Sequence, residues 1–590
     1  MTTRAELQRM AISPTPIFAR FFTHFGRSAA VLFLLAASLI GQQGSTADHT
    51  KFEELQGPFT DGPSVTRACL QCHTEAAAEF MKTRHWTWYS EVESLAGEDG
   101  KRNLVGKGGS VINNFCIAVA SNEPRCTSCH AGYGWKDKEF DFAEEARVDC
   151  LICHEQTGTY KKYPTDAGHP VYEAKEWPKG SGKLWQPPDL AVVAQSVGTP
   201  TAENCGSCHF SGGGGEGVKH GDMDGSLINA PREHDVHLSP EGGDFNCTRC
   251  HTTEHHEIAG PVATLAARDK HEFLVAGEEG DRLACESCHT ARPHAFDMDK
   301  GADPNASFLA TKLDDHSDKV ACQTCHVPTF ARTKPTKMWW DWSTAGDKVD
   351  GKPRVSKTEV KGVPVMDYHG MKGDFIWALD VAPEYRWYNG KAGQAFIGDA
   401  VDDSTPGSET TSRGAFDHLD LAQPVVAINR PEGSYADANA RIWPFKIHRG
   451  KQLYDPVTRK LIVPKLFGPK ESGAYWTNYD WDLAAAKGME YVGEEWSGES
   501  DWIQTEMFWP LTHMVAPKEQ ALDCVACHAP EGRLSTLTDF YLPGRDRNTW
   551  VDLLGWLAVG GAAVGTMGHL ALRLAFKRKR ERKQSEGGAK

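Results

Sequence analysis

Cysteine and histidine recur together along this chain at a fixed spacing. Of the 17 cysteines, 16 form pairs separated by two residues, and a histidine directly follows each pair. Both thiols of such a motif can bond a porphyrin covalently while the histidine ligates its iron, which is the attachment signature of c-type haem. The eight motifs, numbered 1 to 8 in chain order, are Cys69–His73, Cys126–His130, Cys150–His154, Cys205–His209, Cys247–His251, Cys285–His289, Cys322–His326 and Cys524–His528.

The motifs predict eight covalently bound haem c groups. Zinc sites also use cysteine pairs, but they do not require a histidine after every second cysteine. The same spacing argues against disulfides. The predicted attachment residues are Cys69, Cys72, Cys126, Cys129, Cys150, Cys153, Cys205, Cys208, Cys247, Cys250, Cys285, Cys288, Cys322, Cys325, Cys524 and Cys527, and the predicted proximal ligands are His73, His130, His154, His209, His251, His289, His326 and His528.

Each iron also needs a sixth ligand. A second histidine is usual for electron transfer, whereas an open or weakly occupied position indicates chemistry. Any single histidine could instead be a surface or core residue. The candidate distal ligands are His85, His220, His237, His256 (with His255 as its neighbour), His294, His316 and His513.

The spacing of the motifs also bears on the fold. Seven of them lie between Cys69 and His326, too few residues to enclose each haem in its own protein core. We therefore expect a mainly α fold with long loops and little sheet, organised around a covalent haem array over residues 48–335. Short helices should follow the motifs, as the good helix formers of Thr74–Met81 indicate.

A long stretch without a motif separates His326 from Cys524. It contains tryptophan-rich segments such as MWWDWS at Met338–Ser343. Aromatic side chains pack well against porphyrin edges. We expect residues 336–545 to be a loop-rich wrapping segment that carries the eighth haem, with a separate catalytic domain as the alternative; His369, His418 and His448 within it could still be ligands.

The two ends predict an exported, anchored body. Basic residues, an apolar run at Ala29–Ile40 and the small residues Ser45–Ala47 indicate a signal peptide over residues 1–47, with an uncleaved anchor as the alternative. Leu553–Leu572 lacks Asp, Glu, Lys and Arg and is long enough to cross a bilayer. We expect a transmembrane helix at 550–576 and a basic tail at 577–590 that stays in the cytoplasm. A buried core helix is the alternative.

These expectations place the body on the periplasmic face of a bacterial cytoplasmic membrane. A net charge of −15 argues against a nucleic-acid partner, because phosphate contacts need a basic face. A membrane quinol-oxidising cytochrome or another redox protein is the expected partner, and an oligomer remains open.

From Cys69 to His528 the chain resembles the octahaem tetrathionate reductase-type cytochromes c. The resemblance is carried by the eight all-histidine motifs, the long gap before motif 8, and the segments Thr157–Pro170 (TGTYKKYPTDAGHP), Gly212–Asp222 (GGGGEGVKHGD) and Trp509–Lys518 (WPLTHMVAPK). It implies seven bis-histidine haems and a catalytic haem on motif 2 with a distal lysine.

Carried over to this sequence, the resemblance makes Lys161 or Lys162 the ligand, with Cys116 and Lys219 in the pocket and Asp166 as an acid partner. Taken by itself, Cys116 reads equally well as a small buried apolar residue. No Cys-x-x-Cys-Lys motif occurs, which weakens a dedicated ammonia-forming nitrite reductase.

Two functions follow from these observations. The first is an oxidoreductase that reduces a small anionic sulfur or nitrogen compound such as tetrathionate or nitrite, or hydroxylamine. The second is an electron relay between a quinol-linked membrane cytochrome and another redox partner, without a substrate of its own.

Overall fold

The computed structural model describes residues 47–92, 103–178, 180–258, 284–295, 304–401, 418–420 and 423–587. The chain forms two units, Met1–Gln56 and Gly57–Lys590. The described part of the first unit holds the short 3-10 helices η1 (His49–Lys51) and η2 (Glu53–Leu55). Except for Ala47, the predicted signal peptide lies outside the described residues.

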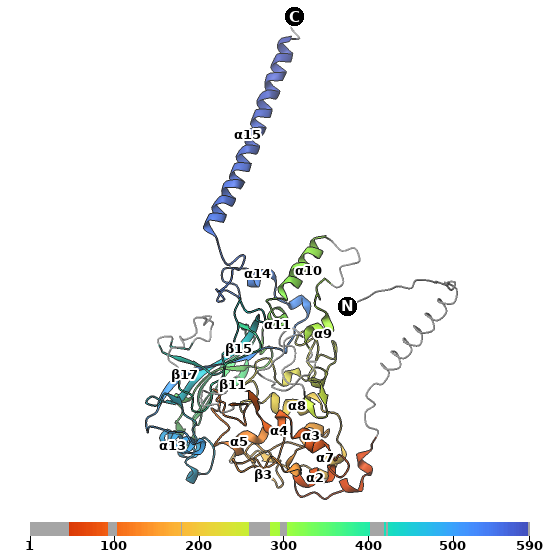
Figure 1. The fold of residues 1–590 in the computed structure, drawn as a ribbon, viewed down its shortest axis with the longest axis vertical. Helices are drawn as coiled ribbons and strands as arrows, with labels where there is room; N and C mark the ends of the chain where they lie inside the picture. Colours follow the sequence, from red (N-terminus) through yellow and green to blue (C-terminus); the bar gives the residue numbers. More distant parts are fainter. Residues whose placement is uncertain are drawn as a thin grey trace, which may run out of the picture. The chain divides into compact units, whose positions relative to one another are not determined.

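Short helices carry or flank the motifs of the second unit (Figure 1). The prediction of a helix after motif 1 is confirmed in a shorter form, because α3 covers only Ala76–Phe80. The α-helices are α2 (Gly62–Cys69), α3, α4 (Arg84–Thr87), α5 (Glu123–Cys126), α6 (Leu151–His154), α7 (Leu190–Gln195), α8 (Ala202–His209), α9 (Cys285–His289), α10 (Pro304–His316), α11 (Cys322–His326), α12 (Tyr475–Asn478), α13 (Trp481–Val492), α14 (Cys524–Cys527) and α15 (Thr549–Gly587).

The 3-10 helices of this unit are single turns in the connections. They are η4 (Thr127–Cys129), η5 (Glu145–Arg147), η6 (Gly225–Leu227), η7 (Cys247–Arg249), η9 (Trp342–Thr344), η10 (Lys470–Ser472) and η11 (Lys518–Gln520).

The motif helices show how the local sequence presents haem-binding groups. In α8, Thr201 caps the first turn and exchanges hydrogen bonds with Asn204. Residues three and four apart lie on one face of a helix. Cys205, Cys208 and His209 therefore point to the same side of α8, as thioether attachment and iron ligation from one motif require.

The expectation of little sheet is wrong, and a mainly α fold is not confirmed: the chain has about 31% helix and 18% strand. Residues from Thr336 onward form a nine-stranded sheet in the order β10-β11-β12-β7-β15-β17-β14, with β13 and β16 also paired to β15. Its strands are β7 (Thr336–Asp341), β10 (Val355–Val360), β11 (Val363–His369), β12 (Gly373–Ala378), β13 (Glu384–Tyr388), β14 (Val425–Ala427), β15 (Arg441–Asp455), β16 (Lys460–Leu461) and β17 (Asp501–Pro510).

Four two-stranded ribbons complete the strand inventory of the described residues. They pair β1 (Ser90–Val92) with β2 (Asn103–Val105), β3 (Lys175–Glu176) with β4 (Leu184–Trp185), β5 (Thr253–Glu254) with β6 (Glu257–Ile258), and β8 (Lys348–Val349) with β9 (Lys352–Pro353).

Strand β15 is the centre of the sheet. It pairs antiparallel with β17 along ten residues and parallel with β7 at Arg449–Lys451. Gly450 permits this parallel pairing, because a Cβ there would lie 2.4 Å from the carbonyl oxygen of Trp340. Nearly every residue of β15 is buried, so both faces of the strand are covered.

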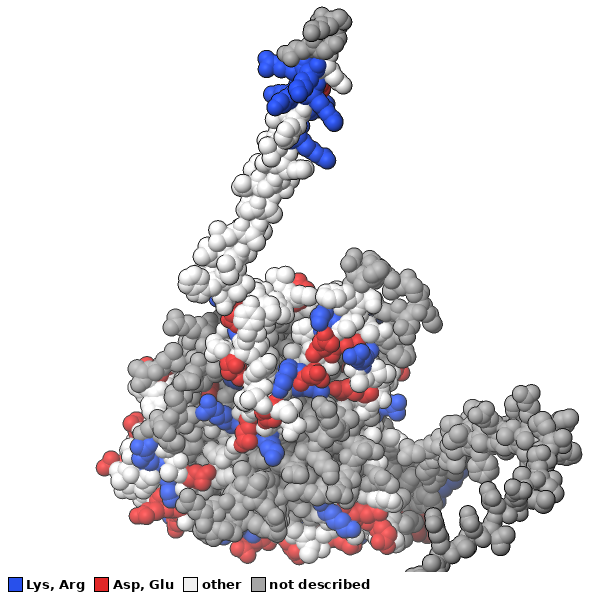
Figure 2. Space-filling model, turned by 45° about the horizontal axis from the view of Figure 1, so that its top comes forward, with Lys and Arg blue, Asp and Glu red and all other residues white. Residues whose placement is uncertain are grey.

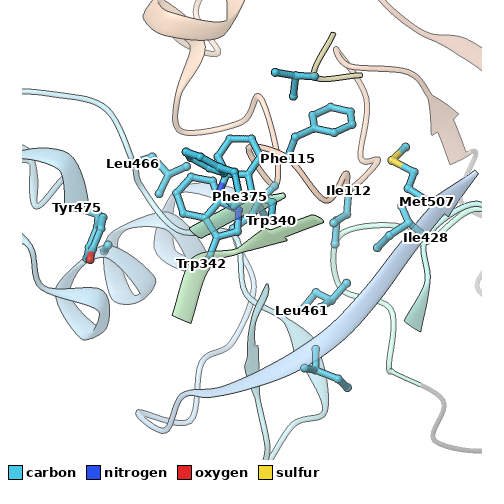
Figure 3. Close-up of a cluster of buried hydrophobic side chains, with 14 of the residues drawn as sticks. Ile112, Phe115, Trp340, Trp342, Phe375, Ile428, Leu461, Leu466, Tyr475 and Met507 are labelled. Atoms are coloured by element: carbon cyan, nitrogen blue, oxygen red, sulfur yellow. The ribbon is translucent and has the colours of Figure 1, made fainter. Parts of the chain in front are cut away.

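The tryptophan-rich segment therefore wraps the molecule as sheet rather than as loops. Aromatic and β-branched residues favour strands, and the rings of Trp340 and Trp342 stack with centroids 4.6 Å apart. They share one core cluster with Phe375 of β12 and with Ile112 and Phe115, which come from the region before motif 2 (Figure 3). The sheet thus covers the segment that holds Cys116.

Helix α15 has a different character. It is long and apolar enough to cross a membrane, and none of its apolar window is buried. Figure 2 shows an uncharged shaft followed by a cluster of basic side chains towards its C-terminal end, which includes Lys577 and Arg578.

Candidate haem sites and a cationic pocket at motif 2

Five motif histidines face a second histidine from elsewhere in the chain. With metal–nitrogen bonds of about 2 Å, two imidazoles on opposite sides of one metal ion have ring centroids roughly 6 Å apart. The observed centroid separations are 6.1 Å for His209 and His85, 6.5 Å for His154 and His256, 6.0 Å for His289 and His237, 6.4 Å for His326 and His294, and 6.1 Å for His528 and His316. The structure thus brings together five of the predicted distal histidines and their motifs.

Hydrogen bonds orient several of these rings. A metal-ligating histidine usually donates its second ring nitrogen to a carbonyl or carboxylate. His154 and His528 place Nδ1 2.9 Å from the carbonyl oxygens of Gly198 and Pro543, and His294 places Nδ1 2.9 Å from Asp314 Oδ1. Nε2 of each ring is left for the iron, so these residues fit haem c.

The other two predicted distal ligands have no ring pairing of this kind in the structure. His513 places Nδ1 3.2 Å from Asp222 Oδ2, and its charge acts on Cys247 of motif 5. The ring of His220 lies 5.2 Å from the Trp509 ring. Their ligand roles stay predictions.

Motif 2 differs from the paired sites. His130 is fully buried among aromatic rings, and the centroid of Trp135 lies only 4.9 Å away. Its Nε2 is 2.7 Å from the carbonyl oxygen of Trp86, while its Nδ1 has no hydrogen-bond partner among the described residues. The nitrogen that the paired motifs leave for iron is thus hydrogen-bonded in His130, whose ring is not oriented here to ligate a haem iron through Nε2.

The attachment cysteines bring the motifs into a spatial sequence. Thiols of different motifs lie close enough to affect each other's ionisation. These neighbours place motifs 8, 7, 6, 5, 4 and 2 in a row, in that order. Motif 3 neighbours motif 4, and motif 1 neighbours motif 3. The thiols of Cys322–Cys285, Cys247–Cys205, Cys208–Cys129 and Cys150–Cys69 are in hydrogen-bond contact, whereas Cys527–Cys325, Cys288–Cys250 and Cys153–Cys205 act on each other only through their charges.

Lys219 lies beside motif 2, and no acidic side chain of the described residues pairs with it. Its Nζ sits 4.5 Å from the centroid of the Trp509 ring. Burial lowers the pKa of Lys219 to about 7, the charge of Lys107 acts in the same direction, and Cys129 of motif 2 opposes both. The pKa of Lys219 therefore lies near neutral pH, beside an attachment cysteine of motif 2.

Two further lysines approach Cys116 from the sheet. Lys337 of β7 places Nζ 3.3 Å from the centroid of Phe375 and 3.8 Å from that of Trp340. Burial holds the pKa of Lys337 well below its usual range, the charge of Lys372 acts in the same direction, and Cys116 opposes both. Burial also lowers the pKa of Lys372, again against the effect of Cys116.

Cys116 connects this group to motif 2. Its Sγ is 3.9 Å from the carbonyl oxygen of Gly213, its side chain packs against the core cluster of Trp340 and Phe375, and it interacts with Cys126. We call Cys116, Lys219, Lys337 and Lys372 the cationic pocket. Lys337 and Lys372 act on Cys116, while Lys219 lies against Trp509 on the side of motif 2, and the amines of these lysines suit a small anion.

The lysines predicted as ligands have other surroundings. Lys161 is exposed. The Lys162 ammonium is 4% exposed, lies 3.0 Å from Asp149 Oδ2 and donates to the carbonyl oxygens of His130 and Gly132. Asp166 lies at the surface, 3.9 Å from Lys175, and is not brought into the pocket. Lys162 thus touches motif 2 as part of a buried ion pair.

Sequence reasoning missed Lys337 and Lys372. They are far from motif 2 in sequence, and no motif marks them. The only signal was the position of Lys337 directly before the tryptophan-rich segment, where a lysine in an apolar strand is unusual. His448, noted as a possible ligand, is fully buried beside Phe115, and its Nε2 has no hydrogen-bond partner among the described residues.

Comparison with known proteins identifies the family. The families described as "Cytochrome c554 and c-prime" and "Cytochrome c bacterial" match residues 68–155 and 337–531. The crystal structure of octahaem cytochrome c from Shewanella oneidensis aligns with 42% identity and a TM-score of 0.66, over 83% of this chain and 95% of that one. The chain belongs to the octahaem cytochrome c family.

This octahaem cytochrome c is also similar to an uncharacterised protein of Archaeoglobus fulgidus, with 25% identity over 246 residues, which are 36% of this chain and 80% of that protein. Family membership assigns to the chain covalent haem c and a redox function in multihaem electron transfer. It also makes the chain an oxidoreductase in the general sense. The tetrathionate reductase type is a narrower statement, and it belongs to the proposal below.

Proposed function

We propose that the chain is an exported octahaem cytochrome c, anchored by α15, that carries eight haems and reduces a small anionic sulfur or nitrogen compound at motif 2. The observation that carries the proposal is the cationic pocket. Lys219, Lys337 and Lys372 have no carboxylate partner among the described residues. Cations shielded from water are normally paired, so the buried Lys337 and the half-buried Lys219 and Lys372, without a carboxylate partner among the described residues, favour an anionic ligand.

The residues of the pocket have distinct tasks in this proposal. Cys126, Cys129 and His130 would hold a haem c, which would supply electrons to the substrate when bound. The amines attract the anion and, when protonated, donate hydrogen bonds to its oxygens. Tetrathionate reduction takes up two electrons, breaks the central S–S bond and releases two thiosulfate anions. Hydroxylamine and nitrite reduction also consume protons, which protonated lysines can supply.

We assign the distal lysine of motif 2 to Lys219 rather than to Lys161 or Lys162. A lysine ligates iron as the neutral amine. The Asp149 carboxylate and two carbonyl oxygens favour the charged form of Lys162, whereas the contact of Lys219 is with a tryptophan ring. Lys219 would therefore hold the haem iron of motif 2 through its neutral amine, and Lys162 would not.

Anion titration tests the proposal. Oxidised protein is titrated separately with nitrite, hydroxylamine and tetrathionate, while electron paramagnetic resonance follows the individual haems. We expect one haem to change, and Lys337→Met to weaken the nitrite effect at least tenfold. Lys357→Met, on the exposed face of β10, is the control. Eight haems that all fail to respond would exclude the reductase.

The electron relay is the second candidate. It is favoured by the position of motif 8 next to α15 and by the continuous order of motifs away from it. A relay predicts fast reduction by a membrane donor with no anion response, so the same titration separates the two functions.

A further inference from the structure

The chain folds back on motif 8 after forming it. Pro543 places its carbonyl oxygen 2.9 Å from His528 Nδ1. Gly544 follows with a φ of +88°, and a Cβ at this position would lie 2.2 Å from the His528 carbonyl oxygen. A glycine is therefore required where the chain returns to the proximal histidine.

The returning segment is fixed to the folded body. The Arg545 guanidinium donates to the carbonyl oxygens of Leu534 and Phe540 and pairs with Asp546 at 2.7 Å. Asp539 accepts a hydrogen bond of 2.8 Å from the Trp387 indole of β13. Motif 8 thus lies in an ordered part of the body rather than on a tail.

Only a short connection separates this segment from α15. Asn548 Oδ1 accepts from the backbone amides of Trp550 and Val551 and so caps the helix at its first turn. An extended chain spans at most about 3.5 Å per residue, so the distance from Pro543 to Thr549 is at most ~20 Å. Whatever direction α15 takes, its insertion in a bilayer keeps motif 8 near the membrane surface.

Large apolar side chains are exposed around motif 8, among charged residues such as Asp523 and Glu531. Val525 lies inside the motif and is 69% exposed, and Tyr541 is 67% exposed. Phe308 and Leu309 are exposed on α10, whose last residue, His316, faces His528. At a rise of 1.5 Å per residue, Phe308 lies roughly 12 Å along the helix from His316.

The motif 8 surface also stands at one end of the haem order. Motif 8 neighbours motif 7, and motifs 6, 5 and 4 follow before motif 2 and its cationic pocket. Electrons that enter at motif 8 and leave at motif 2 would therefore pass through most of the haem-binding motifs.

We propose that Phe308, Leu309, Val525 and Tyr541 form the docking surface for a membrane-embedded, quinol-oxidising redox protein, and that electrons reach this chain at motif 8. The inference rests on the membrane anchor and the redox function proposed above. Each quinol oxidised by the partner releases two electrons to the exported body and two protons to the solvent. Exposed apolar patches of this kind mark protein or membrane contacts, and the short tether selects a partner in the same membrane.

Substitution of the surface tests the docking. Membrane vesicles of the producing organism, carrying the full-length protein, are supplied with a menaquinol analogue, and haem reduction is followed by absorbance. We expect Val525→Asp/Tyr541→Asp to slow reduction at least tenfold, while dithionite reduces the variant as it reduces the unmodified protein. Val349→Asp, which alters another exposed valine, on β8, should have no effect. An unchanged rate in the double variant, or an equal loss in the control, overturns the proposal.

A longer tether gives an independent readout. A flexible chain extends as about 5–6 Å times the square root of its length, so 30 Gly/Ser residues inserted after Arg547 add roughly 30 Å. The lower effective concentration should slow quinol-driven reduction. The same insertion after Lys583 should not. Equal rates for both insertions contradict a tethered docking site. In a separate experiment, protein reduced with dithionite is titrated with nitrite, which tests motif 2 without the membrane donor. A failure of the reductase proposal is thereby distinguished from a failure of docking.

Discussion

The imidazole rings of His294 and His326 lie almost parallel, at an interplanar angle of 16° with centroids 6.4 Å apart. The two residues come from different segments, and Asp314 of α10 fixes the His294 ring by accepting from both its Nδ1 and its backbone amide. By contrast, His316 and His528 meet at 89°. Neighbouring motifs 7 and 8 thus both pair two histidines, but the rings are nearly parallel at motif 7 and perpendicular at motif 8.

This geometry predicts the effect of His294→Met. Parallel imidazole planes give a rhombic low-spin iron signal, and replacing one imidazole by a thioether raises the reduction potential. We expect one rhombic resonance to disappear and one haem to titrate at higher potential. Redox titration with paramagnetic resonance measures both. His369→Met, outside the paired sites, is the control, and an unchanged spectrum for His294→Met would contradict ligation by His294.

The lysine assignment predicts different outcomes for two substitutions. Lys219→Met should alter the resonance of one haem, because it removes the amine beside motif 2. Lys162→Met should leave the ligand field unchanged and act on stability. Magnetic circular dichroism in the near infrared distinguishes lysine from histidine ligation. The reverse result, with a change only in Lys162→Met, would favour Lys162 as the ligand.

The buried pair of Lys162 and Asp149 predicts a large stability effect. Asp149 also accepts hydrogen bonds from the hydroxyl groups of Tyr133 and Tyr160. Asp149→Asn leaves the Lys162 charge unpaired, which should cost about 3–5 kcal/mol. Guanidinium unfolding, followed by circular dichroism, measures the loss. Asp166→Asn, at an exposed pair with Lys175, should cost only about 0–1 kcal/mol, and equal losses would refute the structural role of Asp149.

The burial of Lys337 predicts how anion binding depends on pH. A lysine carries its charge below its pKa, and burial holds the pKa of Lys337 well below the usual range. Nitrite affinity should be full at low pH and should fall as pH rises through this lowered pKa, before ordinary lysines near 10.4 titrate. Nitrite titrations across this range measure the effect. Lys337→Met should abolish this dependence, and a profile that persists in the variant would assign it to another group.

The lowered pKa of Lys337 also predicts how the unfolding free energy changes with pH. Between its lowered folded pKa and its ordinary unfolded pKa, Lys337 binds more protons in the unfolded chain. The unfolding free energy should therefore rise with pH across that window. Unfolding of Lys337→Met beside the unmodified protein should show a weaker rise.

By itself, the sequence determined the attachment chemistry of this protein. Cys-x-x-Cys-His is local: a single helical turn places both sulfurs and the imidazole on one side, so eight motifs could be recognised without the fold. Five of the predicted distal histidines also face motif histidines, although the sequence could not say which histidine faces which motif. The apolar run of α15 could also be recognised from the sequence alone, because its length and composition define it.

Tertiary structure decided the rest. Strands β7 and β15 pair across about a hundred residues, and buried strands of this kind lack the alternation that would reveal them in a sequence. Strand β7 also holds the Lys337 amine against Trp340 and Phe375, which belong to the cluster that Cys116 packs against. Whether a lysine is ion-paired, as Lys162 is, or lies against a tryptophan, as Lys219 does, depends on residues brought from distant segments. The sequence could therefore name the haem-binding residues, but only the packing of the sheet against motif 2 assembled the cationic pocket.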